Sequence, residues 1–312
     1  MQRPSPLRLL LAVALLAVCT SGTWLLSHSR SYQSATGGLK VVASFYPMGE
    51  FASQVGGNKV QVTTLVKPGT EPHDYDPSAS DMATIYQSKV LIYNGAGLER
   101  WADKISGELD AHKVVHIRAS DGLSLRPRAQ SDAENNASAD PHVWMDPVLA
   151  IRQVTNIKKG LIAADPANRQ TYETNAANYI AQLQALSSSF KTGLQHCRLH
   201  QIVTSHQAFS YLAAEYDLQA VGIAGLSPDS EPSPEKLAQV AEFARKNNVG
   251  YIFFETLLSP KLSQTIAREV GAKTIAFNPL EGLTANEIAA GKNYVSVQKD
   301  NLRALRTALD CN

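Results

Sequence analysis

The sequence has no extended run of lysines and arginines, and its charges nearly cancel. Its 312 residues include 29 Lys and Arg against 28 Asp and Glu. Proteins that bind nucleic acid usually carry a basic patch or stripe, so we do not expect nucleic acid as a partner. Charged residues make up 18% of the chain and hydrophobic residues 44%. This composition is that of a globular protein and excludes a disordered one.

Long apolar segments are scarce, and the clearest lies at the N-terminus. Two arginines precede "LLLAVALLAVC" at 9–19, which is the pattern of an export signal. The polar "TSGT" that follows favours a signal over a membrane-spanning helix. "LAVC" resembles a bacterial lipobox with Cys19 lipidated, but Val18 fits that motif poorly, and cleavage further along is the alternative. We expect residues 1–38 to be signal and tether, and the protein to be exported, either periplasmic or tethered to the outer face of the cytoplasmic membrane.

Cysteine is also rare, with three residues in the chain. If Cys19 belongs to the signal, Cys197 and Cys311 remain. An even pair in an oxidising compartment predicts a disulfide, which would tie the C-terminal end to the start of the second half. Two unpaired thiols are the alternative.

Apolar strands alternate with helical segments from residue 39 onward. The strands expected in the first half lie within 39–48, 59–66, 89–97 and 113–120. Such alternation predicts a mostly parallel sheet with helices on both faces. A polar loop at 121–140 and a helix beginning near Asp146 complete a first α/β lobe at 39–165.

A long helix is expected at 166–196, because apolar side chains recur there at helical spacing: Tyr172, Ala176, Tyr179, Leu183, Leu186 and Phe190. Its length would be about 40 Å at 1.5 Å per residue. The alternation of strands and helices then restarts and predicts a second α/β lobe at 197–312. The expected fold is two parallel-sheet α/β lobes joined by one long rigid helix. Ligands of such sheets bind at the carboxyl ends of the strands, here in the cleft between the lobes.

Four polar side chains lie in loops that would border this cleft: three follow expected strands, and His142 precedes an expected helix. The first half contributes His73, in "GTEPHDYDPS", and His142, in "ADPHVWMDP"; the second half contributes His206, in "IVTSHQAF", and Glu281, in "IAFNPLEGLT". Three imidazoles and a carboxylate suit tetrahedral Zn²⁺. A single histidine at a strand end is more often an ordinary hydrogen-bonded residue, and Glu281 could cap a turn. Spacing alone leaves both interpretations open.

Five motifs, in this order along the chain, resemble a known family: "GTEPHDYDPS", "DPHVWMDP", "TSHQAFSYLAAEYDL", "GLSPDSEPSPEKLAQV" and "NPLEGLT". The family is the zinc- and manganese-binding extracytoplasmic solute-binding proteins of bacterial ABC transporters. The resemblance runs from about residue 40 to the C-terminus. It implies two α/β lobes, a rigid connecting helix and a metal ion between the lobes. It also implies delivery of that ion to a membrane permease driven by a cytoplasmic ATPase, and we expect a monomer.

The resemblance assigns roles to individual residues. It places His73, His142 and His206 on the three histidine-ligand motifs of the family, and Glu281 on the acidic fourth ligand of the zinc-type branch. Related members also carry a cysteine pair like Cys197 and Cys311, in keeping with the disulfide.

Other acids are expected to orient the ligating imidazoles by accepting their second N–H group: Glu71, Asp76, Asp146 and Glu255. Glu71 is also an alternative fourth ligand. Asp146 is equally suited to cap a helix, and Asp76 to form a turn.

The ligand set favours Zn²⁺, with Mn²⁺ as the alternative. Manganese-type members usually have a carboxylate at the third ligand position and an Asp in the last-strand loop, where this chain has His206 and Glu281. Mn²⁺ prefers more oxygen ligands, whereas imidazoles suit Zn²⁺. The loop at 121–140 contains no histidine, so a metal-scavenging role for it is not supported.

An exported zinc-dependent hydrolase is the alternative class of function, because zinc can activate a bound water. The chain lacks an H-E-x-x-H motif, and all four ligand positions are filled by side chains. A closed site leaves no position for a substrate, so we expect a binding protein with no catalytic residues.

Overall fold

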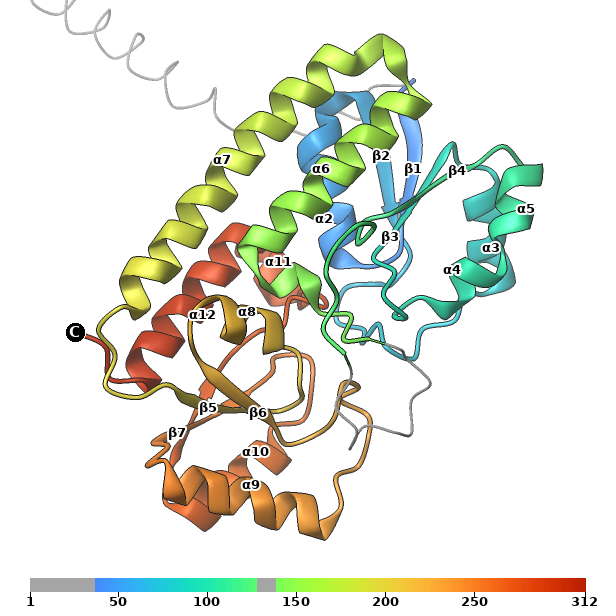
Figure 1. Ribbon diagram of the computed structural model, residues 1–312. Coiled ribbons are helices and arrows are strands. Elements are labelled where there is room, and N and C mark those ends of the chain that lie inside the picture. The colour runs from blue at the N-terminus through green and yellow to red at the C-terminus, as the bar shows by residue number, and fades with distance from the viewer. Residues whose placement is uncertain (1–36, 128–138) are drawn as a thin grey trace, which may run out of the picture. The chain divides into compact units, whose positions relative to one another are not determined.

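The computed structural model describes residues 37–127 and 139–312. The expected export signal, Cys19 and the centre of the 121–140 loop lie outside these residues. Residues 37–312 form one compact unit, in which strands and helices alternate in two successive runs (Figure 1). No helix of the described part is both long and apolar enough to cross a membrane.

The first sheet is parallel and has the strand order β2-β1-β3-β4. Its strands are β1 Leu39–Ala43, β2 Val60–Thr64, β3 Val90–Tyr93 and β4 Val115–Arg118. Its helices are α2 Tyr46–Gly56, α3 Ala79–Tyr86, α4 Arg100–Lys104, α5 Ser106–Ala111 and α6 Pro147–Ala164, with short 3₁₀ turns at η1 Gly57–Lys59 and η3 Val143–Met145. All four residues of β3 are buried, as expected for an interior parallel strand covered on both faces.

The second sheet repeats this arrangement, with the parallel order β6-β5-β7-β8. Its strands are β5 Gln201–Thr204, β6 Gln219–Gly222, β7 Tyr251–Phe254 and β8 Lys273–Ala276. Its helices are α8 Ser210–Glu215, α9 Pro234–Lys246, α10 Lys261–Val270, α11 Ala285–Ala289 and α12 Tyr294–Ala308. The two parallel-sheet α/β lobes predicted from the sequence are therefore confirmed.

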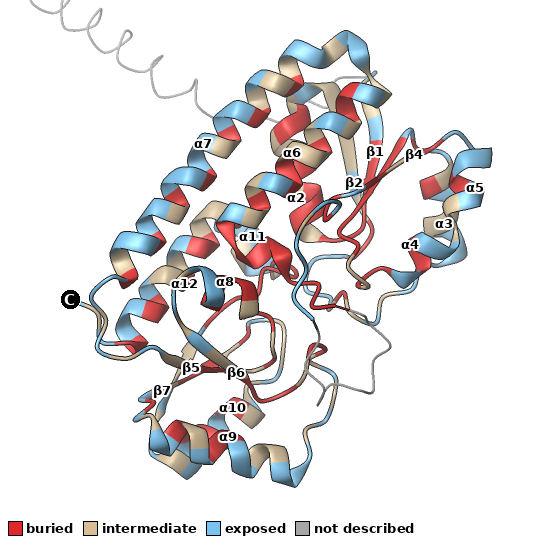
Figure 2. Cartoon of the chain, viewed as in Figure 1, coloured by how far each residue is buried: buried red, intermediate tan, exposed pale blue. Residues whose placement is uncertain are grey.

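The connecting helix is also confirmed: η4 Pro166–Asn168 leads into α7 Arg169–Leu194, a helix of 26 residues. Its apolar side chains at helical spacing are all buried. They pack against α6 and α2 of the first lobe and α12 of the second. Figure 2 shows buried positions recurring along one side of α7 while the opposite side is exposed.

Aromatic side chains from both lobes share one core. The ring of Phe51, on α2, lies 5.0 Å from that of Tyr294, on α12, and Phe45 packs edge-on against Trp144. The Trp144 indole N–H donates to the carbonyl of Pro279 (2.8 Å), and the Tyr294 hydroxyl donates to the carbonyl of Trp144 (2.6 Å). The segment that follows His142 is thus attached to the second lobe by packing and by hydrogen bonds.

A disulfide joins Cys197 to Cys311, which are 114 residues apart in the sequence. A backbone hydrogen bond joins the same two segments: Leu199 N–H donates to the carbonyl of Leu309 (3.0 Å). The predicted disulfide is confirmed, and it joins the end of the chain to the segment between α7 and β5.

Replacing both cysteines, Cys197→Ala with Cys311→Ala, should lower the free energy of unfolding by about 2–5 kcal/mol, because a crosslink around a long loop restricts the unfolded chain. Urea unfolding of the double variant and of the oxidised wild type would measure the difference. As a control, the reduced wild type should match the variant. Equal stability of the oxidised wild type and the variant would contradict this prediction.

Candidate metal centre

Three imidazoles and one carboxylate meet where the carboxyl ends of the two sheets face each other. His73 lies in the loop after β2, and His142 in the loop after β4. His206 follows β5 by two residues, and Glu281 lies in the loop after β8. One ligand atom from each lies within 4.8 Å of the others. The structure therefore brings together all four residues that the sequence predicted as ligands.

The spacing of these atoms suits a small tetrahedral ion. Glu281 Oε1 lies 3.1 Å from His73 Nε2, 3.2 Å from His142 Nε2 and 3.1 Å from His206 Nε2. His142 Nε2 lies 3.2 Å from His73 Nε2 and 3.3 Å from His206 Nε2. Ligands about 2.0–2.1 Å from a tetrahedral zinc are themselves about 3.3 Å apart. These five separations match five of the six edges of such a tetrahedron, and the ligand atoms of the sixth pair, His73 and His206, lie within 4.8 Å of each other.

Carboxylates behind two of the imidazoles determine which nitrogen faces the centre. His142 Nδ1 lies 2.8 Å from Asp140 Oδ1, and His206 Nδ1 lies 2.6 Å from Glu255 Oε1. With its proton on Nδ1, each ring donates to its carboxylate and turns the lone pair of Nε2 toward the other ligands. Two or three nitrogen lone pairs aimed at one point repel each other unless a cation lies between them. The donor set therefore fits a metal ion.

The pKa shifts show that the centre favours positive charge. Burial would raise the pKa of Glu281, but the imidazoles of His206, His142 and His73 outweigh it and hold that pKa well below its ordinary value. Burial would also lower the pKa of His206, yet Glu255 and Glu281 raise it well above its ordinary value. For His73, which has no carboxylate behind its ring, burial dominates and lowers the pKa. Protons or a cation can supply the positive charge that these buried carboxylates require.

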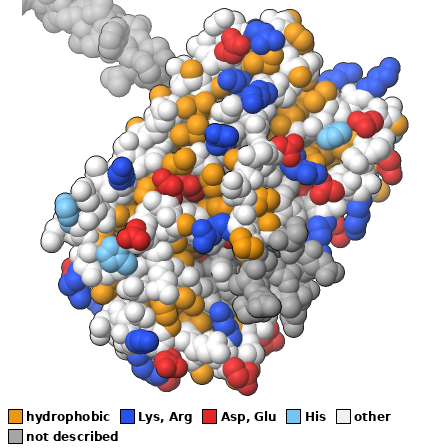
Figure 3. Space-filling view, viewed as in Figure 1, with side chains coloured by type: hydrophobic (Ala, Val, Ile, Leu, Met, Phe, Trp, Pro, Cys, Tyr) orange, Lys and Arg blue, Asp and Glu red, His pale blue; other side chains and the backbone are white. Residues whose placement is uncertain are grey.

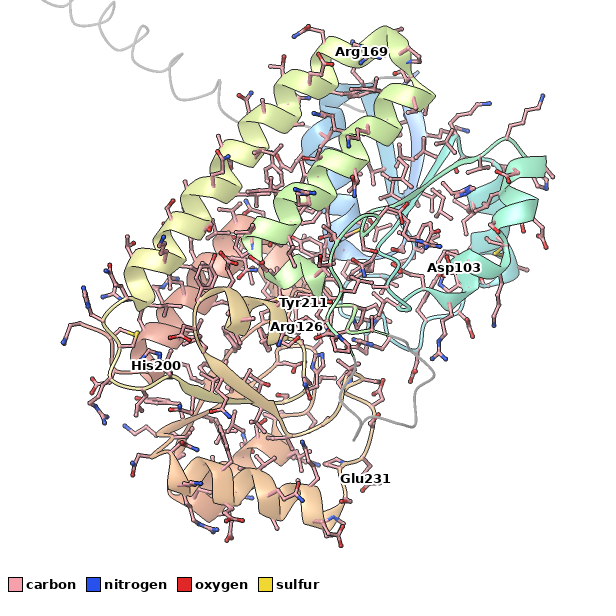
Figure 4. The ribbon with its side chains drawn as sticks, viewed as in Figure 1. Asp103, Arg126, Arg169, His200, Tyr211 and Glu231 are labelled. Carbon is pink, nitrogen blue, oxygen red and sulfur yellow. A yellow bond between two sulfur atoms is a disulfide. The ribbon has the colours of Figure 1, made fainter. Side chains whose placement is uncertain are left out.

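Asp140 is a site residue that sequence reasoning missed. Besides the His142 ring, its Oδ1 accepts the backbone N–H of His142 (3.0 Å). Its Oδ2 accepts from Ser210 of the second lobe, and its carbonyl accepts from the hydroxyl of Tyr211 (2.7 Å). Tyr211 also accepts from the backbone N–H of Arg126 (2.9 Å), and the two residues lie side by side in Figure 4. Asp140 thus orients a ring of the first lobe while it is held by the second.

A repeated tripeptide could have revealed Asp140. Both histidines that the first lobe contributes to the cluster stand in an acid-Pro-His sequence, Glu71-Pro72-His73 and Asp140-Pro141-His142. In each, the acid accepts the backbone N–H of the histidine two residues later, at 3.0 Å. Of these two acids, only Glu71 is among those expected from the sequence.

The other predicted acids have different positions. Glu255 contacts the His206 ring, as described above. Glu71 borders the cluster, with Oε1 4.0 Å from His73 Nε2, and burial together with Glu281 raises its pKa to about 10. Asp146 caps α6 instead of contacting a histidine, since its side chain accepts from Val148 N–H. Asp76 is exposed, and within the described part of the chain it has no hydrogen bond to a cluster histidine.

The space around the cluster is small. The hollow beside His73, lined also by Asp74, Arg100 and Ser227, has a volume of about 30 Å³. A second hollow behind Glu281 has about 110 Å³. Pockets for organic ligands usually measure roughly 300–1,000 Å³. The hollows described next to the cluster therefore suit an ion or water better than an organic substrate.

Comparison with known proteins identifies the family. The family model described as "Zinc-uptake complex component A periplasmic" matches residues 41–308. The chain belongs to this family. It is 40% identical over 306 residues to the zinc-binding lipoprotein AdcA of Streptococcus pneumoniae, covering 96% of this chain but only 61% of AdcA. It is 39% identical over 279 residues to the high-affinity zinc uptake system protein ZnuA of Bacillus subtilis, covering 87% of this chain and 88% of ZnuA.

A solved structure supports this assignment to the zinc-uptake component A family. The Zn(II)-bound ZnuA-like domain of S. pneumoniae AdcA is 42% identical, with a TM-score of 0.77, and the match covers 88% of this chain and all of that domain. The chain thus spans about three fifths of full-length AdcA and corresponds to its ZnuA-like part.

The capping role of Asp146 leads to a prediction on pH. Burial raises its pKa to about 7, whereas an unfolded Asp titrates near about 4. Because the folded-state pKa is the higher one, the stability that Asp146 contributes is complete below about pH 4 and is lost as the pH rises to about 7. Asp146→Asn keeps a capping oxygen but does not ionise. Urea unfolding should show the variant gaining stability relative to wild type between pH 4.5 and pH 8, and an unchanged difference would contradict this.

Proposed function

We propose that this chain is an extracytoplasmic zinc-binding protein that delivers Zn²⁺ to an ABC permease powered by a cytoplasmic ATPase. The observation that carries the proposal is the tetrahedron formed by His73, His142, His206 and Glu281, with Asp140 and Glu255 behind two of its rings. Membership in a zinc-uptake family supports it. The names of the relatives support zinc in particular, although AdcA is the longer protein.

In this proposal each lobe supplies two ligands. The first lobe, at 39–165, contributes His73 and His142; the second, at 197–312, contributes His206 and Glu281. The helical segment 166–196 connects them. Capture would close the tetrahedron, and release would require separating at least one pair of ligands. The protein would be exported, periplasmic or membrane-tethered, and would act as a monomer.

Zn²⁺ fits this centre better than Mn²⁺. Three nitrogens and one oxygen at tetrahedral separations match the usual coordination of zinc, whereas Mn²⁺ prefers more oxygen ligands. Glu71 is a further carboxylate close to His73, and its pKa of about 10 favours its neutral form, a poorer ligand. We propose Glu281, not Glu71, as the fourth ligand.

A zinc hydrolase fits the site less well. A catalytic zinc keeps one coordination position for water or substrate, but here four side chains supply a complete tetrahedron. The two hollows beside the cluster, of about 30 and 110 Å³, would not hold a peptide or sugar. We therefore propose a transport role without catalysis.

The ligand set can be tested by titrating metal-stripped protein with Zn²⁺ and with Mn²⁺ in competition calorimetry. We expect one Zn²⁺ per chain, strong preference over Mn²⁺, and a loss of more than roughly 100-fold in zinc affinity for His206→Ala and for Glu281→Ala. The control is His200→Ala, because His200 is exposed and its ring is hydrogen-bonded to the carbonyl of Asp217, away from the cluster. Tighter Mn²⁺ binding would indicate the manganese branch, and unchanged affinity of the ligand variants would refute the site.

The orienting acids can be tested separately. Asp140→Asn and Glu255→Gln should each weaken zinc binding by about 10- to 100-fold, because they remove the charge that fixes the tautomer of a ligating ring. Asp76→Asn removes an acid from an exposed position and should bind like wild type. Competition with a chelator of known affinity would provide the measurement. The orienting role is wrong if all three variants bind zinc equally.

A further inference from the structure

A lysine followed by a valine lies within two residues of the start of every strand of the first sheet. The pairs are Lys40-Val41, Lys59-Val60, Lys89-Val90 and Lys113-Val114. Because the strands are parallel, these lysines lie along one edge of the sheet. Lys89 N–H donates to the carbonyl of Lys40 (2.9 Å), and Val115 N–H donates to the carbonyl of Lys89 (3.0 Å). Four lysines that are far apart in the sequence are therefore neighbours at the amino edge of the sheet.

The junction of α6 and α7 lies at the same edge. α6 runs antiparallel to β4, since Asn156 donates to the carbonyl of Ala119 just after the strand, while Gly160 lies against Ile117 within it. The helix then continues past the amino edge. At the start of α7, Asn175 donates to the carbonyl of Val55, next to η1, which ends in Lys59.

This junction adds three cations beside a groove of about 450 Å³. Lys158, Lys159 and Arg169 line the groove together with Glu173 and apolar residues of α6 and η4. Figure 3 shows Lys and Arg side chains at this end of the molecule, where Figure 4 labels Arg169. We call the seven cations the basic edge: Lys40, Lys59, Lys89, Lys113, Lys158, Lys159 and Arg169.

Most of the charge on the basic edge is not neutralised. Arg169 pairs with Glu173 (3.4 Å), but within the described residues none of the six lysines has an ion pair. Four acids lie near the edge: Glu173, Glu108, which accepts from Tyr86, Asp165, which accepts from Asn168 and Tyr172, and Asp110, 3.8 Å from His116. Hydrogen bonds from neutral groups do not cancel an acid's charge, so the edge has seven cations against these four acids. The edge is positive although residues 37–312 contain 26 basic and 28 acidic residues.

The position of the basic edge in the chain suggests its partner. The described structure begins at Gly37, two residues before β1, and Gly38 lies against the carbonyl of Lys59. The 36 preceding residues contain the predicted signal and tether. Any attachment to a membrane through that segment would join the described part at Gly37, beside the basic edge. Clusters of lysine next to a membrane segment are attracted to acidic lipids.

We propose that the basic edge docks on the surface of a bilayer containing anionic phospholipid. The lysines contact lipid phosphates, and the groove between α6 and α7 lies against the headgroups. The candidate metal centre lies at the carboxyl ends of the same strands, so docking leaves the cleft uncovered and able to take up an ion. This inference goes beyond zinc delivery and does not depend on it.

The test uses residues 37–312, which form a compact unit separate from residues 1–36, so that the tether does not contribute. The protein is sedimented with phosphatidylcholine vesicles, with or without about 30% phosphatidylglycerol. We expect binding to the anionic vesicles at least about tenfold stronger at low salt, and loss of this difference at about 0.5 M salt. Equal binding to the two kinds of vesicle at low salt would overturn the proposal.

A triple variant, Lys89→Gln, Lys113→Gln and Lys159→Gln, locates the surface. These side chains are exposed, and their removal should reduce binding to anionic vesicles by about tenfold or more. The matched control is Lys246→Gln, Lys261→Gln and Lys273→Gln, which removes the same charge from exposed positions of the second lobe. Thermal unfolding and zinc titration of both variants would verify folding. A loss of equal size in both triples would show attraction by overall charge and refute a docking edge.

Discussion

The contact of the Glu281 carboxylate with three imidazole nitrogens is the constraint around which the cleft is organised. Glu281 is 1% exposed, and an unpaired buried carboxylate would be strongly destabilising. Its pairing requires loops that follow β2, β4, β5 and β8 to meet at one point. Asp140 and Glu255 must also be in place. Each orients one imidazole ring, of His142 and of His206, so that its Nε2 faces Glu281. The same arrangement that neutralises Glu281 presents four ligand atoms to a cation.

The positions of the four ligand loops depend on a rigid frame. Trp144 and Tyr294 connect the loop after His142 to the second lobe, and α7 packs against helices of both lobes along its whole length. Core residues of the two lobes form one continuous cluster. Interiors packed at this density do not deform continuously, so the ligand loops begin from a fixed geometry. The disulfide holds the end of the chain to the same frame.

The first sheet has chemically different edges. Its carboxyl edge carries imidazoles and carboxylates, and its amino edge carries the lysines of the basic edge. Both follow from parallel strands, since equivalent ends of every strand meet at the same edge. Residues of one type near the same end of every strand therefore gather at one edge, as these lysines do. The lysines of this edge are far apart in the sequence and form no run. This explains why no basic patch was evident from the sequence.

The sequence by itself determined the two α/β lobes, the long helix and the four candidate ligands, because strand and helix periodicity, Pro-rich turns and family motifs are local signals. It also indicated the Cys197–Cys311 pair. Tertiary structure decided which acids serve the site. Asp140 lies two residues before His142 and Asp146 four residues after it, yet Asp146 caps α6 while Asp140 contacts the ring. Which acid contacts the ring depends on backbone direction and on contacts between the lobes. The gathering of the lysines at one edge depends on backbone direction as well. Local spacing in the sequence encodes neither.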